Sequence, residues 1–327
     1  MKGRFSIRRA TLVAVPVFCT SWLALPAHAQ KFSDWSAPIN LGPTINSGVN
    51  NQHPAISKNG LSLYFSSDRA GTFGKLDIWV SQRPSLDDSW GTLQNPGPNI
   101  NSSNIDMAPG FTPDGHWLYF HSDRPGGCGP SGSDLYVSHR KDKHDDFGWE
   151  PAENLGCVIN SIYDDAGPTF FDDEELDVTL LYFTSTRPAP LGGGGFDIYV
   201  SPLQPDGTWG PGLFVPELSG PGRDTRTAIR RDGLEILLSA DRPGAVGGQD
   251  IWVSTRATTA DKWSTPVNLG PIVNSTAFDG APALSRDATT LYFFSERTDV
   301  VHYGKRDLYV TTRTKLHDKD KDDDDPR

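Results

Sequence analysis

The sequence predicts an all-β chain folded as a closed five-bladed β-propeller with four-stranded antiparallel blades. Three anchors recur five times in a constant order, which is the sign of a repeat architecture. The first is an Arg that directly follows a polar or acidic residue. The second is an Asp that begins a β-rich run. The third is a short polar residue five positions after the first residue of an Asn-Ser pair or its variant. The anchors fall at Arg69, Arg124, Arg187, Arg242 and Arg297; at Asp77, Asp134, Asp197, Asp250 and Asp307; and at Asn51, Asp106, Asp165, Asp224 and Asp279.

Each repeat contains short runs suited to strands. In the second repeat these are residues 109–112, 117–122 and 134–137 and a segment that begins at Trp149; the runs are rich in Val, Ile, Tyr, Phe and Trp across the repeats and are separated by Gly- and Pro-containing turns. Such composition favours antiparallel sheet, and no stretch has the periodicity of a helix. A long repeat period of short strands predicts propeller blades, which bury their faces against one another.

The two ends of the chain predict how the ring closes. The last copy stops after residues 307–313 and lacks the Trp-led segment of the other copies. Residues 35–47 nearly duplicate that segment as it occurs at 263–275. We therefore expect the N-terminal strand to complete the last blade, which removes a free sheet edge.

The run from Pro109 to Arg124, Pro-Gly-Phe-Thr-Pro-Asp-Gly-His-Trp-Leu-Tyr-Phe-His-Ser-Asp-Arg, is followed by Asp134-Leu-Tyr-Val. This pattern resembles the TolB-type (WD-like) propeller repeat of secreted and periplasmic proteins, and the resemblance spans residues 35–313. It implies a propeller used as a partner-binding scaffold. The best-known family member has six blades and an extra N-terminal domain, so its partner is not carried over to five blades.

The termini predict export and a charged tail. Lys2, Arg4, Arg8 and Arg9 precede an apolar run at 10–25 and a small-x-small site ending at Ala29, the pattern of a signal peptide over 1–29. We expect a periplasmic or secreted protein, exported by the general or the twin-arginine route, with the propeller at 30–316. Residues 317–327 form an acidic tail whose composition predicts disorder.

Charge narrows the classes of partner. The net charge of −11 becomes −15 once the four cations of the signal peptide are removed. This disfavours nucleic acid and anionic membranes, and no segment after residue 29 has the length and apolarity of a membrane span. An envelope or secreted protein, or a glycan, is the expected partner of a monomer.

Two cysteines remain after cleavage of the signal peptide. Cys128 lies in a loop inside the second blade, and Cys157 lies in the connection to the third. An even pair in an oxidising compartment predicts a disulfide, with two free thiols as the alternative.

The polar series Asn51, Asp106, Asp165, Asp224 and Asp279 is expected to surround one mouth of the central channel. Short polar side chains at such loops commonly cap their own turns. Alternatively, carboxylates at Asp106, Asp165 and Asp279 would hold a hard cation such as calcium through oxygen ligands. The sequence requires no cofactor.

Departures from the repeat suggest the contact residues. At the equivalent position just before each innermost strand, three blades carry Ala or Gly, whereas the other two carry His53 and Arg226. With Gln52, Arg223 and Tyr163 these side chains are the predicted ligand contacts, and simple filling of the channel is the alternative.

Enzyme motifs are absent: the sequence has no Gly-x-Ser-x-Gly, His-Glu-x-x-His or dinucleotide fingerprint. The leading interpretation is a non-catalytic propeller that binds a protein or envelope glycan. The alternative is a carbohydrate-active enzyme of the glycoside hydrolase type, with Asp106, Asp165 and Asp224 as its carboxylates. The acidic insert at 172–177 is expected on the opposite rim, as a solvated turn.

Overall fold

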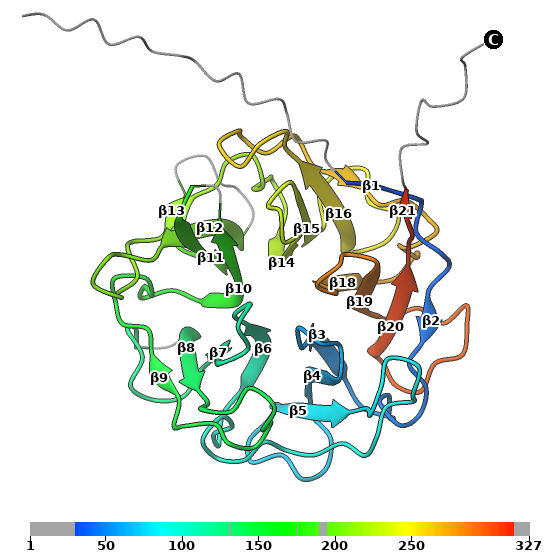
Figure 1. The fold of residues 1–327 in the computed structure, drawn as a ribbon, viewed down its shortest axis with the longest axis horizontal. Helices are drawn as coiled ribbons and strands as arrows, with labels where there is room; N and C mark the ends of the chain where they lie inside the picture. Colours follow the sequence, from blue (N-terminus) through cyan, green and yellow to red (C-terminus); the bar gives the residue numbers. More distant parts are fainter. Residues whose placement is uncertain (1–29, 131, 175, 190–194, 317–327) are drawn as a thin grey trace, which may run out of the picture.

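A computed structural model describes residues 30–130, 132–174, 176–189 and 195–316. The predicted signal peptide at 1–29 and the predicted tail at 317–327 lie outside the described residues. Every regular element in the described ranges is a β-strand, and none of them contains a helix long and apolar enough to cross a membrane. The strands form five blades around a central axis (Figure 1), which confirms the predicted fold class.

The blades follow one another along the chain, each running from the axis outward. Blade 1 consists of β3 (Asn51–Ile56), β4 (Ser62–Ser67) and β5 (Asp77–Gln82), and a bridge between Val80 and Gln94 stands at its outer edge. Blade 2 consists of β6 (Asp106–Phe111), β7 (Trp117–Ser122), β8 (Asp134–His139) and β9 (Glu153–Asn154). Blade 3 consists of β10 (Asp165–Asp173), β11 (Val178–Ser185), β12 (Asp197–Pro202) and β13 (Leu213–Phe214). Blade 4 consists of β14 (Asp224–Ile229), β15 (Glu235–Ala240), β16 (Asp250–Thr255) and β17 (Val267–Asn268).

Blade 5 closes the ring as predicted. It consists of β18 (Asp279–Leu284), β19 (Thr290–Ser295), β20 (Asp307–Thr312) and the N-terminal β2 (Ile39–Asn40), with Ile39 opposite Val310. A second contact between the chain ends pairs β1 (Lys31–Phe32) with β21 (Lys315–Leu316). The Phe32 ring lies 3.8 Å from the Arg313 guanidinium carbon, which fixes this pair against the last blade.

The hydrophobic core lies between blades. The second strand of each blade is buried on both faces, as in β4, where Leu63, Tyr64 and Phe65 have no exposed surface. Burial on both faces explains why these strands carry consecutive apolar residues and not a strict alternation. The Trp that begins the outer segment of each blade is buried or half-buried. Of these five residues Trp209 is the exception to a shared contact, because the other four rings lie against an Arg: Trp35, Trp90, Trp149 and Trp263.

Each innermost strand contains a β-bulge at the same phase. The register shifts at this point in all five blades, and the bulged residue has a positive φ. The five residues are His53, Ala108, Gly167, Arg226 and Ala281. Left-handed backbone is uncommon outside Gly and disfavours large side chains, so the two large residues at this phase stand out from the repeat.

Candidate functional site

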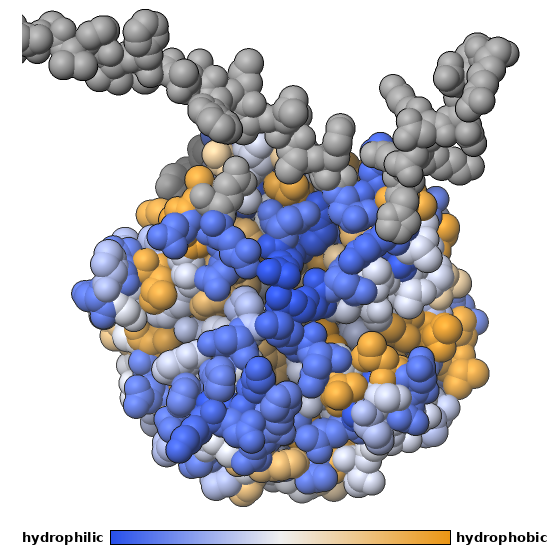
Figure 2. Space-filling view, viewed as in Figure 1, coloured by the Kyte–Doolittle hydropathy of each residue, from blue (hydrophilic) through white to orange (hydrophobic). Residues whose placement is uncertain are grey.

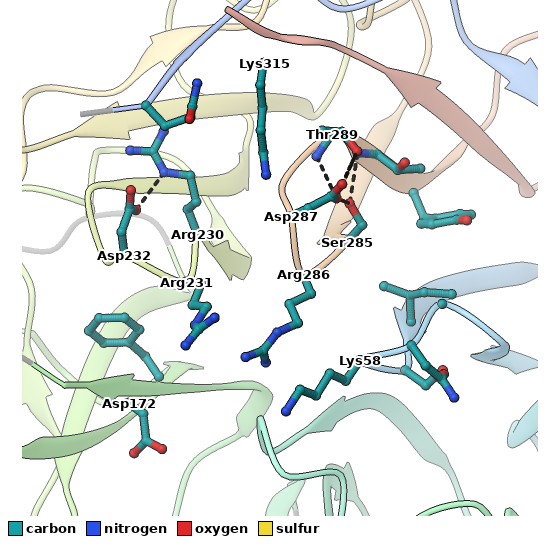
Figure 3. Close-up of a pocket in the computed structure, with 18 of the residues that line it drawn as sticks. Lys58, Asp172, Arg230, Arg231, Asp232, Ser285, Arg286, Asp287, Thr289 and Lys315 are labelled. Carbon is teal, nitrogen blue, oxygen red and sulfur yellow. Dashed lines mark hydrogen bonds and ion pairs between the residues drawn. The ribbon is translucent and has the colours of Figure 1, made fainter. Parts of the chain in front are cut away.

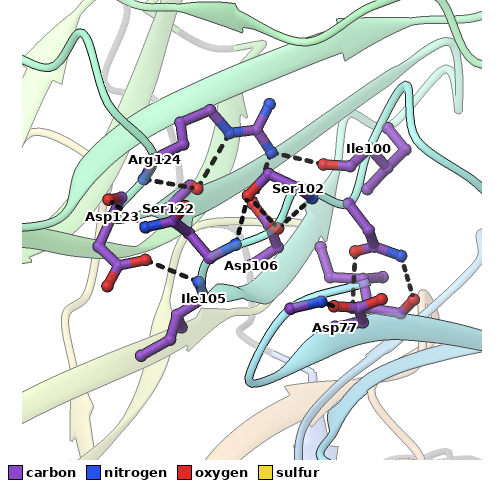
Figure 4. A network of polar contacts seen from close by, with 12 residues as sticks. Asp77, Ile100, Ser102, Ile105, Asp106, Ser122, Asp123 and Arg124 are labelled. Atoms are coloured by element: carbon purple, nitrogen blue, oxygen red, sulfur yellow. Dashed lines mark hydrogen bonds and ion pairs between the residues drawn. The ribbon is translucent and has the colours of Figure 1, made fainter. Parts of the chain in front are cut away.

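The central channel has two mouths. At the strand-start mouth the connecting loops enter the innermost strands, and the predicted ligand contacts were expected there. At the hairpin mouth lie the turns that join the first and second strands of each blade. The close-up in Figure 3 draws residues of the hairpin mouth, and Figure 4 draws a polar network of the strand-start mouth.

The carboxylate series at the strand-start mouth is buried. Asp106 has no exposed surface; one of its oxygens accepts a hydrogen bond from Arg124 Nη2 at 2.5 Å. Its other oxygen accepts from the backbone N–H and the hydroxyl of Ser102, at 2.5 and 2.8 Å (Figure 4). The same pairing joins the remaining members to their own blades: Asn51 to Arg69, Asp165 to Arg187, Asp224 to Arg242 and Asp279 to Arg297.

This geometry gives the polar series a structural role. The side chains cap their loops, as in the first of the two interpretations, and the recurring Arg residues neutralise the four carboxylates. Asp106, Asp165 and Asp224, the carboxylates of the catalytic alternative, show no exposed surface to a substrate. Within the described ranges no three His, Cys, Asp or Glu side chains gather as metal ligands, the predicted calcium trio included.

Arg226 crosses the channel and does not project into an open mouth. Its Nη1 donates to the Ala108 and Pro168 carbonyls at 2.9 and 3.1 Å, and its Nη2 donates to the Pro109 carbonyl at 2.5 Å. The side chain therefore links blade 4 to blades 2 and 3. The side chain is buried. Its N–H groups therefore need acceptors inside the protein, and these three carbonyls accept hydrogen bonds from most of them.

Two histidines lie beside Arg226. Burial, followed by the charge of Arg226, lowers the pKa of His121 to about 3. Burial is also the main reason that the pKa of His53 lies well below its usual value, with Arg226 the next cause. Both rings are therefore neutral at neutral pH, because a further positive charge beside Arg226 in this desolvated space is unfavourable.

The predicted contact residues come together only in part. Gln52, His53, Arg223 and Arg226 line one hollow of about 230 Å³ at the strand-start mouth, together with His121. Tyr163 is 41% exposed and lies outside its lining. The described residues that line this hollow include no Asp or Glu, so it lacks the carboxyl groups that hydrolysis of a glycosidic bond requires.

The hairpin mouth is wider and more charged. A hollow of about 770 Å³ opens there, and a neighbouring one of about 370 Å³ shares Lys58, Asp172, Arg231 and Arg286 with it. In Figure 2 strongly hydrophilic side chains gather over the centre of the ring. Lys58, Arg231 and Arg286 extend into the same space in Figure 3.

The acidic insert of blade 3 forms one wall of this hollow. It lies on the rim predicted for it, but it is more than a solvated turn, because Asp172 and Glu174 line the cavity. Asp172 accepts a hydrogen bond from Thr179 Oγ1 at 2.6 Å, and Glu174 accepts one from Arg231 at 3.2 Å. Sequence reasoning missed this mouth as a site; the clue was that Lys58, Arg231 and Arg286 occupy equivalent turn positions.

The floor of the hairpin mouth is apolar. One apolar residue near the end of each innermost strand is half-buried and lines the channel, giving one residue per blade. The five are Ile56, Phe111, Phe170, Ile229 and Leu284. A polar rim around an apolar floor is typical of sites for small molecules and sugars.

The two remaining cysteines are joined. Cys128 and Cys157 form a disulfide with their Cα atoms 5.4 Å apart. The bond links the β7–β8 loop of blade 2 to the segment that leads from β9 to blade 3.

Comparison with known proteins places the fold among glycoside hydrolase structures. No protein-family model and no curated protein matches the chain. The chain is similar to the solved α-L-arabinofuranosidase of Lactobacillus brevis, with a TM-score of 0.58 and 16% identity over 86% of this chain and 95% of that one. It is also similar to a xylan β-1,4-xylosidase of Bacillus halodurans, with a TM-score of 0.54 and 14% identity over 82% of this chain and 53% of that one. A third is the α-L-arabinofuranosidase of Podospora anserina solved with cellotriose, with a TM-score of 0.51 and 13% identity over 87% and 97%.

These similarities correct two expectations. The resemblance to the TolB-type family is wrong as a guide to relatives, because the matching structures are arabinofuranosidases and a xylosidase. The leading interpretation of a non-catalytic binder is overturned by the same finding, because the three solved structures with this fold are enzymes. At these identities the similarity establishes the propeller fold.

Proposed function

We propose that this chain is a carbohydrate-active enzyme that hydrolyses glycosidic bonds at the hairpin mouth. The observation that carries the proposal is the pair of exposed carboxylates, Asp172 and Glu174, on the wall of the hollow of about 770 Å³. The fold shared with solved arabinofuranosidases and a xylosidase supports it. The predicted signal peptide places the enzyme in the periplasm or outside the cell, where polysaccharide is available.

Both carboxylates are exposed and line the same hollow. Asp172 is the second-last residue of β10, and Glu174 begins the turn that follows it. Hydrolysis with inversion uses two such carboxyl groups on either side of the scissile bond. One carboxyl group would protonate the leaving oxygen while the other activates a water on the opposite face of the sugar.

Asp106, Asp165 and Asp224 are not part of the proposed chemistry. Each is buried and accepts a hydrogen bond from an Arg of its own blade. A sugar reaching one of these carboxylates would have to displace that Arg.

The test is release of reducing ends from arabinan, xylan and acidic polysaccharides by the purified protein. Asp172→Asn and Glu174→Gln are each expected to lose activity by about 10²–10⁴-fold with an unchanged melting temperature. Asp177→Asn is the matched control, because Asp177 belongs to the same insert and is exposed but does not line the hollow. Full activity in both Asp172→Asn and Glu174→Gln would refute the proposal, and NMR detection of the first anomer released tests inversion.

A further inference from the structure

Three cations from three blades meet at the hairpin mouth. Lys58, Arg231 and Arg286 occupy the same position in the hairpin turns of blades 1, 4 and 5, and blade 2 has Pro113 there. All three line both hollows of this mouth. In Figure 3 their side chains extend toward a common space.

The nearby turn carboxylates form no ion pair with these three cations among the described residues. Asp114 accepts from the Thr112 hydroxyl and the His116 N–H, and Asp287 accepts from the hydroxyls of Ser285 and Thr289. Asp232 accepts from the Arg230 guanidinium and the Leu234 N–H. These acids are committed to their own turns.

Only one of the three cations is paired within the part of the chain that the structure describes. Arg231 contacts Glu174 at 3.2 Å, with both side chains more than half exposed, and such a pair contributes little and exchanges readily. Lys58 and Arg286 form no ion pair with another described residue. Three cations that extend into one space, two of them without an ion pair to a described residue, repel one another unless an anion lies between them.

We infer that the hairpin mouth takes an anionic glycan, whose carboxylate or sulfate groups are bound by Lys58, Arg231 and Arg286. That the ligand is a glycan rests on the proposed function. That the ligand is an anion rests on the three cations alone. Arg guanidinium groups bind carboxylate or sulfate oxygens through paired hydrogen bonds. The apolar floor lies beneath the cations and offers a surface to the C–H faces of a sugar ring. In a chain of net charge −11, such a cluster also draws an anion selectively to this mouth.

The experiment measures binding by calorimetry at low and high salt with three probes. These are the trimer of galacturonic acid, a sulfated galactan oligosaccharide and a neutral galactan trisaccharide. The two anionic arms distinguish carboxylate from sulfate as the recognised group. Arg231→Gln and Arg286→Gln are each expected to weaken binding of the preferred anionic probe roughly tenfold, and the triple variant with Lys58→Gln by about a hundredfold or more.

A triple variant with the same change in charge is the control. Lys75→Gln, Lys141→Gln and Lys305→Gln remove three exposed cations that lie outside the hairpin mouth, and binding is expected to stay within about twofold of the parent. Equal losses in the two triple variants would overturn the inference, because the effect would then be one of net charge. Binding of the neutral trisaccharide as tight as that of both anionic probes would overturn it too.

Glu174→Gln gives an independent readout. Removing this carboxylate frees Arg231, so affinity for the anionic probe is expected to rise about threefold; an unchanged or lower affinity counts against the site.

The readouts for binding and for hydrolysis separate the two proposals. Anion binding without hydrolysis leaves the inference standing and refutes the enzyme, whereas hydrolysis of neutral glycans without anion binding does the reverse.

Discussion

Both mouths of the channel carry charged residues, and they use them in opposite ways. At the strand-start mouth one polar series recurs in all five blades, is buried, and is paired within each blade. At the hairpin mouth cations recur at one turn position in only three blades and are exposed or half-exposed, and two of them have no ion-pair partner among the described residues. Recurrence in every blade therefore marks residues that hold the propeller together. Residues present in only some blades include both these cations and the buried Arg226, so exposure and the lack of a partner, and not departure from the repeat alone, mark the residues that are available to a ligand.

The largest expected effect is on a carboxylate of the strand-start mouth. Asp165→Ala would leave the charge of Arg187 without its carboxylate partner in a largely buried setting, so the free energy of unfolding is expected to fall by about 3–5 kcal/mol. Urea unfolding followed by fluorescence measures it. A loss below about 1 kcal/mol would mean that the buried polar series of the strand-start mouth does not stabilise the fold. The contrast drawn between the two mouths would then be wrong.

Removing the Arg that crosses the channel has the next largest effect. Arg226→Ala leaves the Ala108, Pro109 and Pro168 carbonyls without their donor and is expected to cost about 2–4 kcal/mol. Arg223→Ala is the control, because this side chain is exposed and lines the same hollow. In the Arg226→Ala protein the pKa of His121, measured by NMR, is expected to rise but to stay below 6.5, because burial is the larger cause of its shift.

The buried histidines predict a dependence of stability on pH. The pKa of His121 is about 3 in the folded chain and about 6.5 when unfolded, so the unfolded state takes up the proton first. Stability is complete above pH 6.5 and falls below it by about 1.4 kcal/mol per pH unit for this group. His121→Gln is expected to show a shallower loss between pH 6.5 and 5 in urea titrations. Identical slopes in the two proteins would show that His121 is already protonated in the folded chain.

The smallest expected change in stability belongs to the hairpin mouth. Lys58→Gln and Arg286→Gln remove exposed or half-exposed side chains without an ion pair to a described residue, so unfolding free energies are expected to stay within about 0.5 kcal/mol of the parent. The same denaturant titrations check this. A clear loss would give these cations a structural role and blur the distinction between the two mouths.

The repeat made the fold predictable because its anchors constrain the backbone. Four of the Arg anchors follow their polar partners by 18 residues, as Arg124 follows Asp106. This constant spacing indicated that the Arg side chain and its polar partner are in contact. Burial was harder to foresee, because phase along a strand does not reveal which loop covers its end. The sequence also did not disclose that Arg226 spans the channel, since its acceptors are carbonyls from two other blades.

The hairpin mouth escaped prediction for a different reason. Lys58, Arg231 and Arg286 occupy turn positions, where charged residues ordinarily face solvent and need no explanation. Their convergence arises only when five turns are brought around one axis, which is a property of the assembled ring.

The pairing of β1 with β21 has a practical consequence for anything attached to this protein. Gln30, Phe32 and Lys315 belong both to the joined chain ends and to the lining of the hairpin hollow. A carrier or surface linker joined at Gln30 or at Leu316, in place of the residues beyond them, would thus begin at the edge of that hollow. Immobilisation through these two residues would hold the hairpin mouth against the support, whereas coupling through the Cys128–Cys157 loops would leave it facing the solution.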